Sequence, residues 1–128
     1  MTLGNIDSKR DWGHSKDYVY GMWLMLQHDK PDDYVLATGK SMSIRDFVEK
    51  CFIKKDIEIK WIGEGLKEVG IDKKTEKIMI KINKNYFRPC DVNFLLGDST
   101  KSRKILGWKQ EYTMDTLIDE MFLFNSEK

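Results

Sequence analysis

The chain has 128 residues, of which 41% are hydrophobic and 12% aromatic, a composition typical of a folded domain with a hydrophobic core. Its 22 basic and 21 acidic side chains leave a formal net charge of +1, so no overall field would recruit nucleic acid or an anionic membrane. No apolar run approaches the roughly 18 residues of a membrane span, and no signal peptide is recognisable. Cys51 and Cys90 are too few for a disulfide framework. We therefore expect one globular, cytoplasmic unit without nucleic-acid or membrane partners.

A helix and a strand are predicted first. Apolar residues recur at helical spacing over residues 14–29, which predicts an amphipathic helix that ends before Pro31. Its expected core-facing stripe consists of Tyr18, Val19, Met22, Trp23 and Leu26. Residues 34–38 form a short apolar run that Gly39 stops, and we expect them to form a strand.

A second helix and two further strands follow in the chain. Ser43 is a suitable N-cap for this helix, because its side chain can accept a hydrogen bond from a free backbone N–H. The expected core face of the helix is Ile44, Phe47, Val48, Cys51 and Phe52. Residues 57–61 and 77–82 alternate apolar and polar side chains, which predicts two half-buried strands joined by a polar, lysine-rich loop.

The C-terminal part of the chain is expected to contain two helices. Asp98 or Ser99 caps a short helix that ends at Gly107. Thr113 opens the last helix. The expected core side of that helix is Leu117, Ile118, Met121 and Phe122.

The order of these elements predicts the fold class. Few, short strands interleaved with helices favour a small mixed α/β assembly over a doubly wound sheet with a cofactor crevice. Residues 1–4 suit the end of a strand, but no earlier residue could pair with it. The sequence therefore has the character of a portion of a larger fold.

The charged run that starts at Lys9 places anion-binding groups just ahead of the first predicted helix. Arg10 offers a planar fork of donors suited to phosphate, Lys16 adds a point charge, and a helix start near Ser15 presents free backbone N–H groups. This pattern predicts a phosphate-binding loop. The alternative is a solvated loop in which Ser15 and Asp17 act only as helix-start residues.

A second constellation surrounds Arg88. Pro89 restricts the preceding residue to extended geometry and so fixes where the Arg88 guanidinium points, while Asp91 could accept hydrogen bonds from ribose hydroxyls. The pair suits a nucleoside diphosphate. The alternative is that Tyr86 and Phe87 are core aromatics and that Arg88 bridges a surface carboxylate.

Other chemically active residues are assigned structural roles. His14 and His28 lie far apart with no paired cysteines, so no metal site is expected, and His14 is expected to cap or orient the helix start. Trp61 and Trp108 are expected to be core contacts. Cys90 is expected to pack rather than act as a nucleophile, since no histidine lies nearby in sequence.

Much of the chain resembles GDP-mannose 4,6-dehydratases, members of the extended short-chain dehydrogenase/reductase family. The resemblance rests on the closing helix and on the strings LGNIDSKRDWGHSKDYVYGMWLMLQ, DDYVLATGKSMSIRDFVEK and YFRPCDVNFLLGDSTKSRKILGWK. It implies that residues 1–128 are the C-terminal GDP-sugar-binding portion of such a protein. The implied fold is an α/β piece of this Rossmann-type family whose Rossmann core is largely missing and whose N-terminal cofactor domain is absent.

The resemblance also assigns the candidate site residues. Asn5, Lys9 and Arg10 match the segment that lines the nucleotide end of the GDP-sugar site. Arg88 matches the arginine expected at the diphosphate, and Asp91 stands where a ribose-binding glutamate is usual. The implied partner is GDP-mannose or a related GDP-sugar.

The family's reaction implies a cofactor that this chain is not expected to hold. The reaction converts GDP-mannose into GDP-4-keto-6-deoxymannose, the first step toward GDP-fucose and GDP-rhamnose, and it uses NADP. The cofactor site needs a glycine-rich turn between a strand and a helix, and the chemistry needs a tyrosine with a lysine four residues on. The nearest glycine pair, Gly63 and Gly65, is followed by Glu68 where a third glycine is required, and no tyrosine has the lysine. No catalytic residue is expected.

Three hypotheses follow. The first, which we favour, is the substrate-binding portion of a dehydratase, which carries specificity without catalysis. The second is a free-standing GDP-sugar-binding module that binds GDP-mannose but not NADP. The third is a non-catalytic partner that docks onto a full-length dehydratase, since the family forms dimers or tetramers; a homo-oligomer is the related expectation.

Overall fold

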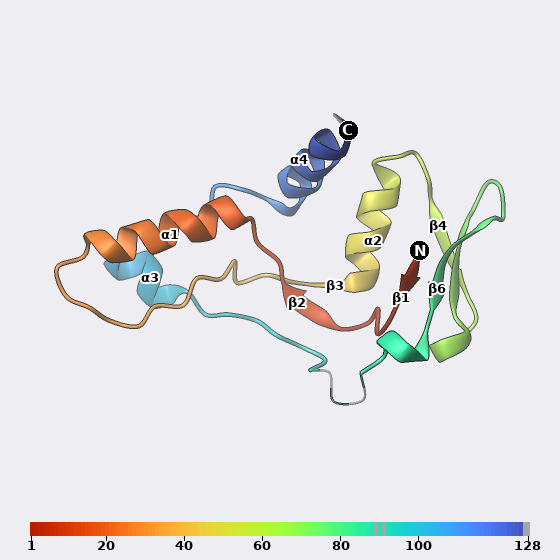
Figure 1. The fold of residues 1–128 in the computed structure, drawn as a ribbon, viewed down its shortest axis with the longest axis horizontal. Coiled ribbons are helices and arrows are strands. Elements are labelled where there is room, and N and C mark those ends of the chain that lie inside the picture. The colour runs from red at the N-terminus through yellow and green to blue at the C-terminus, as the bar shows by residue number, and fades with distance from the viewer. Residues whose placement is uncertain (89, 91, 127–128) are drawn as a thin grey trace. The chain divides into compact units, whose positions relative to one another are not determined.

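The fold divides into two compact units in place of the single unit expected. The structure, a computed structural model, describes residues 1–88, 90 and 92–126, with side chains up to residue 124 (Figure 1). One unit comprises Met1–Arg10 and Met42–Phe94, and the other Asp11–Ser41 and the described residues of Leu95–Lys128. We refer to them as the sheet unit and the helical unit. No helix among the described residues is both long and apolar enough to cross a membrane.

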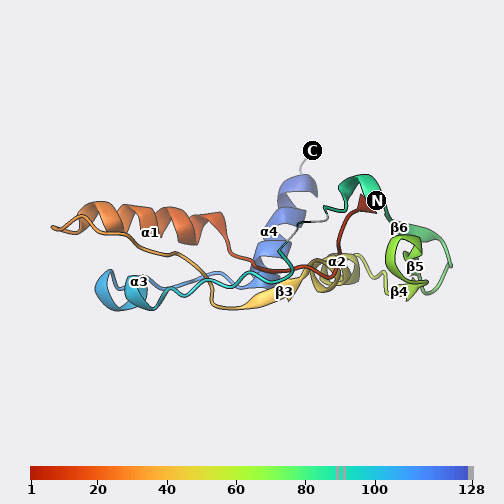
Figure 2. The same cartoon turned by 90° about the horizontal axis from the view of Figure 1, so that it is seen from below.

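The sheet unit is built on four strands in the order β1-β6-β5-β4 (Figure 2). These strands are β1 (Thr2–Leu3), β4 (Ile59–Ile62), β5 (Val69–Asp72) and β6 (Ile78–Ile82). β1 runs parallel to β6, whereas the pairs β5·β6 and β4·β5 are antiparallel. The partner of the N-terminal strand, which the sequence does not reveal, therefore comes from later in the chain. Two 3₁₀ turns, Gly65–Lys67 and Lys84–Tyr86, follow β4 and β6.

Helix α2 (Ile44–Ile53) completes the sheet unit as predicted. Ser43 is its N-cap and accepts a hydrogen bond from the Asp46 N–H, while the Asp46 carboxylate accepts from the Ser43 N–H in return. The Arg45 guanidinium of α2 lies over the Trp61 ring of β4, 4.5 Å from its centroid, and so joins the helix to the strand. The buried hydrophobic side chains of this unit are Ile6, Val48, Ile71 and Ile80.

The helical unit contains α1 (Ser15–Gln27), α3 (Thr100–Ile105) and α4 (Met114–Ser126). Trp108 is fully buried, and its indole N–H donates to the Asp17 carbonyl oxygen at 2.8 Å. Two short strands, β2 (Lys9–Asp11) and β3 (Ser41–Ser43), include the points at which the chain passes from one unit to the other, and they form a separate two-stranded sheet.

The predicted strand at residues 34–38 is wrong, because these residues belong to neither sheet. Their carbonyl groups are satisfied by side chains instead. The Ser99 hydroxyl donates to the Ala37 oxygen at 2.8 Å, and the Ser102 hydroxyl donates to the Val35 oxygen. Hydroxyl groups of the α3 region therefore replace the neighbouring strand that the apolar run suggests.

The predicted core stripe of α1 is also wrong. The buried residues of this helix are Asp17 and Gly21, and its half-buried residues include Tyr18, Leu24 and Met25. A Cβ added at Gly21 would lie 2.6 Å from the Leu36 methyl carbons and 3.1 Å from Trp108, so glycine permits this close packing. Of the predicted stripe, the exposed residues are Val19, Met22, Trp23 and Leu26. The helix thus packs inward through the side that carries Asp17 and Gly21, and its large hydrophobic side chains are exposed.

Candidate functional site

The candidate site is a hollow in the sheet unit with a volume of about 330 Å³. Its lining residues are Leu3, Gly4, Asn5, Ile44, Asn85, Tyr86 and Arg88. Two of the five predicted site residues, Asn5 and Arg88, therefore share one hollow although they lie at opposite ends of the unit's sequence. The volume is at the lower end of the roughly 300–1,000 Å³ usual for small-molecule sites.

Parallel pairing of β1 and β6 brings the two parts of the hollow together. Parallel strands end at the same edge of a sheet, so Asn5 and the turn Lys84–Tyr86 leave that edge side by side. A hydrogen bond from the Asn83 N–H to the Leu3 oxygen, 2.9 Å long, continues the pairing to this point. The Asn5 side chain accepts from the Asp7 N–H at 3.1 Å, which fixes the loop after β1.

Gly4 permits the closest approach in the hollow. A Cβ at this position would lie 2.1 Å from the Tyr86 carbonyl oxygen, far inside van der Waals contact. We therefore expect Gly4→Ala to move the Tyr86 backbone, to cost about 1–3 kcal/mol of stability and to lower affinity for any ligand of the hollow. Denaturant unfolding and ligand titration measure the two effects. Gly97→Ala is the matched control, because its Cβ would lie 2.2 Å from Ala37 and both residues belong to the helical unit, away from the hollow. Equal loss of affinity in both variants would contradict the assignment.

Lys9 and Arg10 contact the segment that follows Arg88, at residues 92–94. The Lys9 N–H donates to the Asn93 oxygen at 2.8 Å, and Lys9 forms a parallel bridge with Phe94. The Arg10 guanidinium donates through Nη1 to the carbonyl oxygens of Lys9 at 2.9 Å and Val92 at 2.5 Å. Arg10 therefore holds the chain that follows the Arg88 segment, whereas the Lys9 side chain is exposed.

The predictions for the other residues near Arg88 have different outcomes. Tyr86 is 63% exposed and Phe87 41%, so the alternative that they are core aromatics is wrong. Cys90 is exposed, which contradicts its expected packing role. Asp91, the predicted ribose ligand, lies outside the described residues. Sequence reasoning missed Asn85, although its position directly before Tyr86 places it in the same turn.

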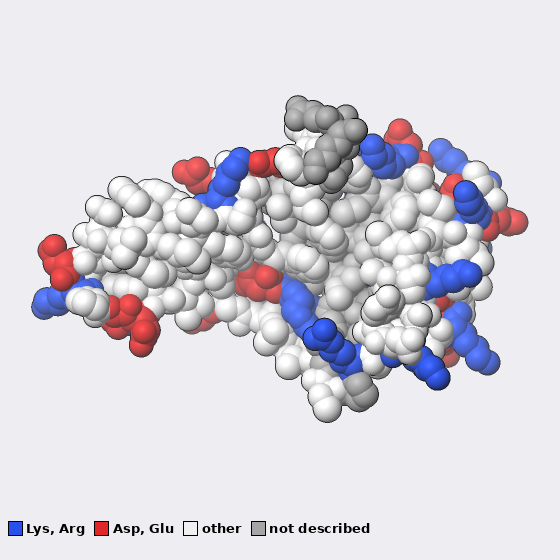
Figure 3. All heavy atoms as spheres, viewed as in Figure 1, with Lys and Arg blue, Asp and Glu red and all other residues white. Residues whose placement is uncertain are grey.

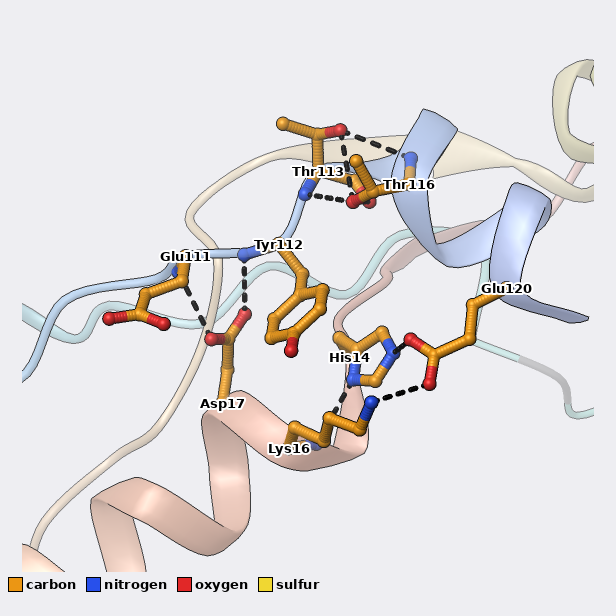
Figure 4. A network of polar contacts seen from close by, with 8 residues as sticks. All are labelled: His14, Lys16, Asp17, Glu111, Tyr112, Thr113, Thr116 and Glu120. Carbon is orange, nitrogen blue, oxygen red and sulfur yellow. Dashed lines mark hydrogen bonds and ion pairs between the residues drawn. The ribbon is translucent and has the colours of Figure 1, made fainter.

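The acidic residues of the run after Lys9 have structural roles in the helical unit. The Asp11 carboxylate accepts from the Thr38 N–H at 2.9 Å, the Thr38 hydroxyl at 2.6 Å and the N–H groups of Gly39 and Gly97. The Asp17 carboxylate accepts from the N–H groups of Glu111 and Tyr112 (Figure 4). This part of the run fixes loops instead of presenting a phosphate-binding surface.

His14 caps α1, as the sequence predicts, and links it to α4. Its Nδ1 accepts from the Lys16 N–H at 3.1 Å, so the ring proton is on Nε2, which donates to Glu120 Oε2 at 2.8 Å (Figure 4). Lys16 Nζ contacts Glu120 Oε1 at 2.5 Å, and the ring of Tyr112 stacks on His14 at 4.1 Å. The Lys16 ammonium is therefore paired with a carboxylate, not presented to phosphate. No group of three or more His, Cys, Asp or Glu side chains within the described ranges is arranged to hold a metal ion.

The contacts of Glu120 with Lys16 and His14 predict that the folded chain loses stability in acid. Hydrogen bonds from Lys16 and then from His14 lower the pKa of Glu120 in the folded chain. The unfolded chain thus binds the proton more tightly, and the contribution of Glu120 is present above about pH 4.3 and lost as the pH falls further. We expect Glu120→Gln to lower the melting temperature at neutral pH. Between neutral and acid pH, the melting temperature of this variant should fall less than that of the unmodified chain. Glu111→Gln, whose carboxylate points away from the network, is the control (Figure 4); an identical acid profile for Glu120→Gln and the unmodified chain would refute the assignment.

Comparison with known proteins identifies related sequences over most of the chain. The sequence model of the family described as GDP-mannose 4,6 dehydratase matches residues 1–121. GDP-mannose 4,6-dehydratase of Sinorhizobium fredii is 51% identical over 121 residues, which cover 94% of this chain and 34% of the relative. The human GDP-mannose 4,6 dehydratase is 50% identical over 121 residues, again 94% of this chain and 32% of the relative. The chain thus spans about a third of the length of these relatives.

Solved structures share the fold at low sequence identity. UDP-glucose 4-epimerase from Bifidobacterium longum, solved with NAD+ and UDP, matches with a TM-score of 0.72 and 20% identity, over 99% of this chain and 35% of its own. The RMD protein from Pseudomonas aeruginosa, solved with NADPH, matches with a TM-score of 0.67 and 18% identity, over 92% of this chain and 33% of its own. These likenesses concern the arrangement of the elements.

Proposed function

Because the chain belongs to the GDP-mannose 4,6-dehydratase family, we propose that it supplies the nucleotide-binding part of the GDP-sugar site of such an enzyme. The observation that carries the proposal is the shared hollow of Asn5 and Arg88. Both residues are matched to the GDP-sugar site by family resemblance, and they meet only because β1 pairs with β6.

Arg88 is the proposed diphosphate ligand. The planar fork of N–H donors on its guanidinium matches two phosphate oxygens at once. The amides of Asn5 and Asn85 each provide a donor and an acceptor at the same hollow, which suits a nucleoside better than a simple anion. The exposed ammonium of Lys9 adds positive charge, and Asp91 is the proposed ribose ligand.

Arg10 acts on this site through the backbone. Its Nη1 donates to the carbonyl oxygens of Lys9 and Val92 and so links Lys9 to the chain that follows Arg88. We assign it to the site as a positioning residue. The family resemblance supports a contact of Arg10 with the nucleotide, and its hydrogen bonds support this second role.

The described residues do not fit the NADP that the family uses. The glycine pair Gly63 and Gly65 lies between the antiparallel strands β4 and β5 and leads into a three-residue 3₁₀ turn. A pyrophosphate cradle needs a glycine-rich turn that opens a helix, so its backbone N–H groups and the helix dipole face the phosphates. Hydride transfer is therefore not attributed to residues of this chain.

In the proposed division of labour, this chain holds the nucleotide end of GDP-mannose, and residues of another part of the enzyme face the reacting sugar carbons. The product would be GDP-4-keto-6-deoxymannose, a precursor of GDP-fucose or GDP-rhamnose, formed in the cytoplasm. The chain would contribute affinity and orientation to the reaction.

Calorimetric titration of the 128-residue chain tests the proposal. We expect GDP-mannose and GDP to bind with similar affinity, because the assigned contacts are with the nucleotide, and NADP not to bind. No binding of GDP-mannose or GDP at ligand concentrations up to about 1 mM, equivalent to about −4.1 kcal/mol, would refute it. Equal binding of NADP would refute the division of labour.

A further inference from the structure

A second hollow lies entirely within the helical unit and has no part in the proposed function. Its volume is about 420 Å³, and it is lined by residues 38–40 and 97–100 together with Arg103 and Gln110. We call it the polar hollow. Every lining residue is polar or a glycine, whereas most small-molecule sites are lined mainly by apolar and aromatic side chains. The lining therefore suits a ligand that is polar over most of its surface.

Hydrogen bonds hold the two loops of the polar hollow in place. The Asp11 carboxylate accepts from the N–H groups of Gly39 at 3.0 Å and Gly97 at 3.3 Å, one from each loop. The buried Ser99 hydroxyl donates to the Ala37 oxygen at 2.8 Å and joins the loops a second time. A site whose loops are already ordered loses less conformational entropy when a ligand binds.

Two cations line the polar hollow without a carboxylate partner. Arg103 Nε donates to the Ser99 hydroxyl at 2.9 Å, and its Nη2 donates to the Ala37 oxygen at 3.4 Å. The guanidinium also lies over the Trp108 ring, 5.1 Å from its centroid, so its position is fixed. Among the described residues, neither Arg103 Nη1 nor the exposed Lys40 ammonium has a hydrogen-bond acceptor or an ion-pair partner. The hollow therefore presents unused donors and uncompensated positive charge.

Acceptor groups lie in the same hollow. The Thr100 hydroxyl donates to Asp98 Oδ1 at 2.6 Å and the Thr100 N–H at 2.9 Å, and these bonds lower the pKa of Asp98, so its carboxylate is charged at neutral pH. Gln110 Nε2 donates to the Tyr112 oxygen at 2.7 Å, which leaves the amide oxygen as an acceptor. A carboxylate repels a simple anion but accepts hydrogen bonds from hydroxyl groups. The hollow thus suits a ligand that carries both an anionic group and hydroxyl groups.

A phosphate monoester fits the two cations better than a carboxylate does. Its charge is about −1.5 to −2 at pH 7, the arginine fork matches two of its oxygens, and lysine binds phosphate as a point charge. Of the described residues that line the hollow, none is an aromatic on which a nucleobase could stack. The ligand class that combines a phosphate with hydroxyl groups and needs no aromatic platform is a sugar phosphate.

We propose that the polar hollow is a binding site for a sugar phosphate. The phosphate group contacts Lys40 and Arg103. Hydroxyl groups of the sugar donate to the carboxylate of Asp98 and the amide oxygen of Gln110. The site is distinct from the hollow of the sheet unit, because the two share no lining residue.

Titration of the 128-residue chain with glucose 6-phosphate, followed through its amide NMR signals, tests the proposal. We expect the signals of Gly39 and Gly97 to shift and to saturate at ligand concentrations up to about 10 mM. Inorganic phosphate, which lacks the hydroxyl groups, is expected to bind about tenfold more weakly. Glucose, which lacks the charge, should not shift these signals.

Three variants identify the contacts. Lys40→Ala is expected to weaken binding of glucose 6-phosphate about tenfold. Lys109→Ala is the matched control, because this exposed lysine does not line the hollow, and its affinity should be unchanged. Asp98→Asn removes a negative charge and keeps an oxygen that can accept from Thr100. It should weaken binding of glucose 6-phosphate and tighten binding of inorganic phosphate, a pair of opposite changes that a loss of folding would not produce.

Four results would overturn the proposal. The first is an absence of shifts at Gly39 and Gly97 at about 10 mM glucose 6-phosphate. The second is equal affinity for inorganic phosphate, because the hollow would then not recognise the sugar. The third is an equal loss of affinity in Lys40→Ala and Lys109→Ala, which a general positive field would explain. The fourth is a set of shifts confined to the hollow of the sheet unit. Lys40→Ala should leave the affinity for GDP-mannose unchanged, so this proposal and the proposed function can fail separately.

Discussion

Replacing Arg88 with alanine is expected to lower the affinity of the chain for GDP-mannose and GDP about tenfold to a hundredfold. Removing a charge-assisted hydrogen-bond donor costs about 1.5–3 kcal/mol, and 1.4 kcal/mol corresponds to a factor of ten. Arg88 is exposed at the edge of the Asn5 hollow, so its truncation leaves no buried cavity and folding should be nearly unaffected. Calorimetry measures the affinity, and the melting temperature checks the fold.

Two further variants separate charge from geometry at this position. Arg88→Lys keeps the positive charge but loses the planar fork, so it is expected to bind with intermediate affinity. Lys84→Ala removes an exposed cation from the adjoining 3₁₀ turn and is expected to change the affinity only slightly. If Lys84→Ala weakened binding as much as Arg88→Ala, the general positive field would explain the binding, and Arg88 would not be the diphosphate ligand.

Elements with strong local signals could be predicted from the sequence. Helix α2 is the clearest case, because Ser43 is the N-cap that its sequence suggests, and the structure adds Asp46 as the reciprocal partner of this cap. β6 follows from alternation alone. The mixed α/β fold implied by the family resemblance is confirmed by the likeness to UDP-glucose 4-epimerase structures.

Elements that depend on distant partners could not be predicted in the same way. β5 contains the buried residues Gly70 and Asp72, which are poor strand formers, and it exists because β4 and β6 pair with its two edges. β1 has two residues and pairs with a strand that comes much later. The prediction of a strand at residues 34–38 was wrong for the opposite reason. The local pattern is strong, but no strand among the described residues pairs with this segment.

The candidate site shows the same division between local and distant information. Family resemblance names Asn5 and Arg88, but only the β1·β6 pairing shows that they share a hollow with Asn85. The roles of Arg10 and Lys16 depend on acceptors distant in sequence, Val92 and Glu120, that no local pattern identifies. The sequence signal was therefore correct about the region and incomplete about what each cation contacts.

Helix α1 shows why periodicity alone misleads in a part of a larger fold. The apolar stripe predicts which side of a helix is covered, but it does not say by what. Within this chain Asp17 and Gly21 pack inward, because Asp17 binds two backbone N–H groups and Gly21 allows Trp108 to approach. The stripe is instead exposed, and uncharged side chains cover the middle of the helix in Figure 3.

Replacing Trp108 with alanine is expected to have the largest effect on stability, about 3–5 kcal/mol. Its side chain is fully buried, its indole N–H donates to the Asp17 carbonyl oxygen at 2.8 Å, and the Arg103 guanidinium lies over its ring at 5.1 Å. Truncation leaves a cavity beside Gly21 and removes one hydrogen bond from the Asp17 carbonyl oxygen, which keeps its backbone hydrogen bond within α1. Since a domain's total stability is about 5–15 kcal/mol, such a loss should unfold much of the helical unit, which circular dichroism in denaturant would detect.

Trp23→Ala is the matched control, because it removes the same side chain from a position that is 52% exposed. Its effect should be small, since the side chain is half exposed and stacks on the Tyr20 ring at the surface. A large loss of stability for Trp23→Ala would show that α1 packs inward through Trp23, contrary to the structure.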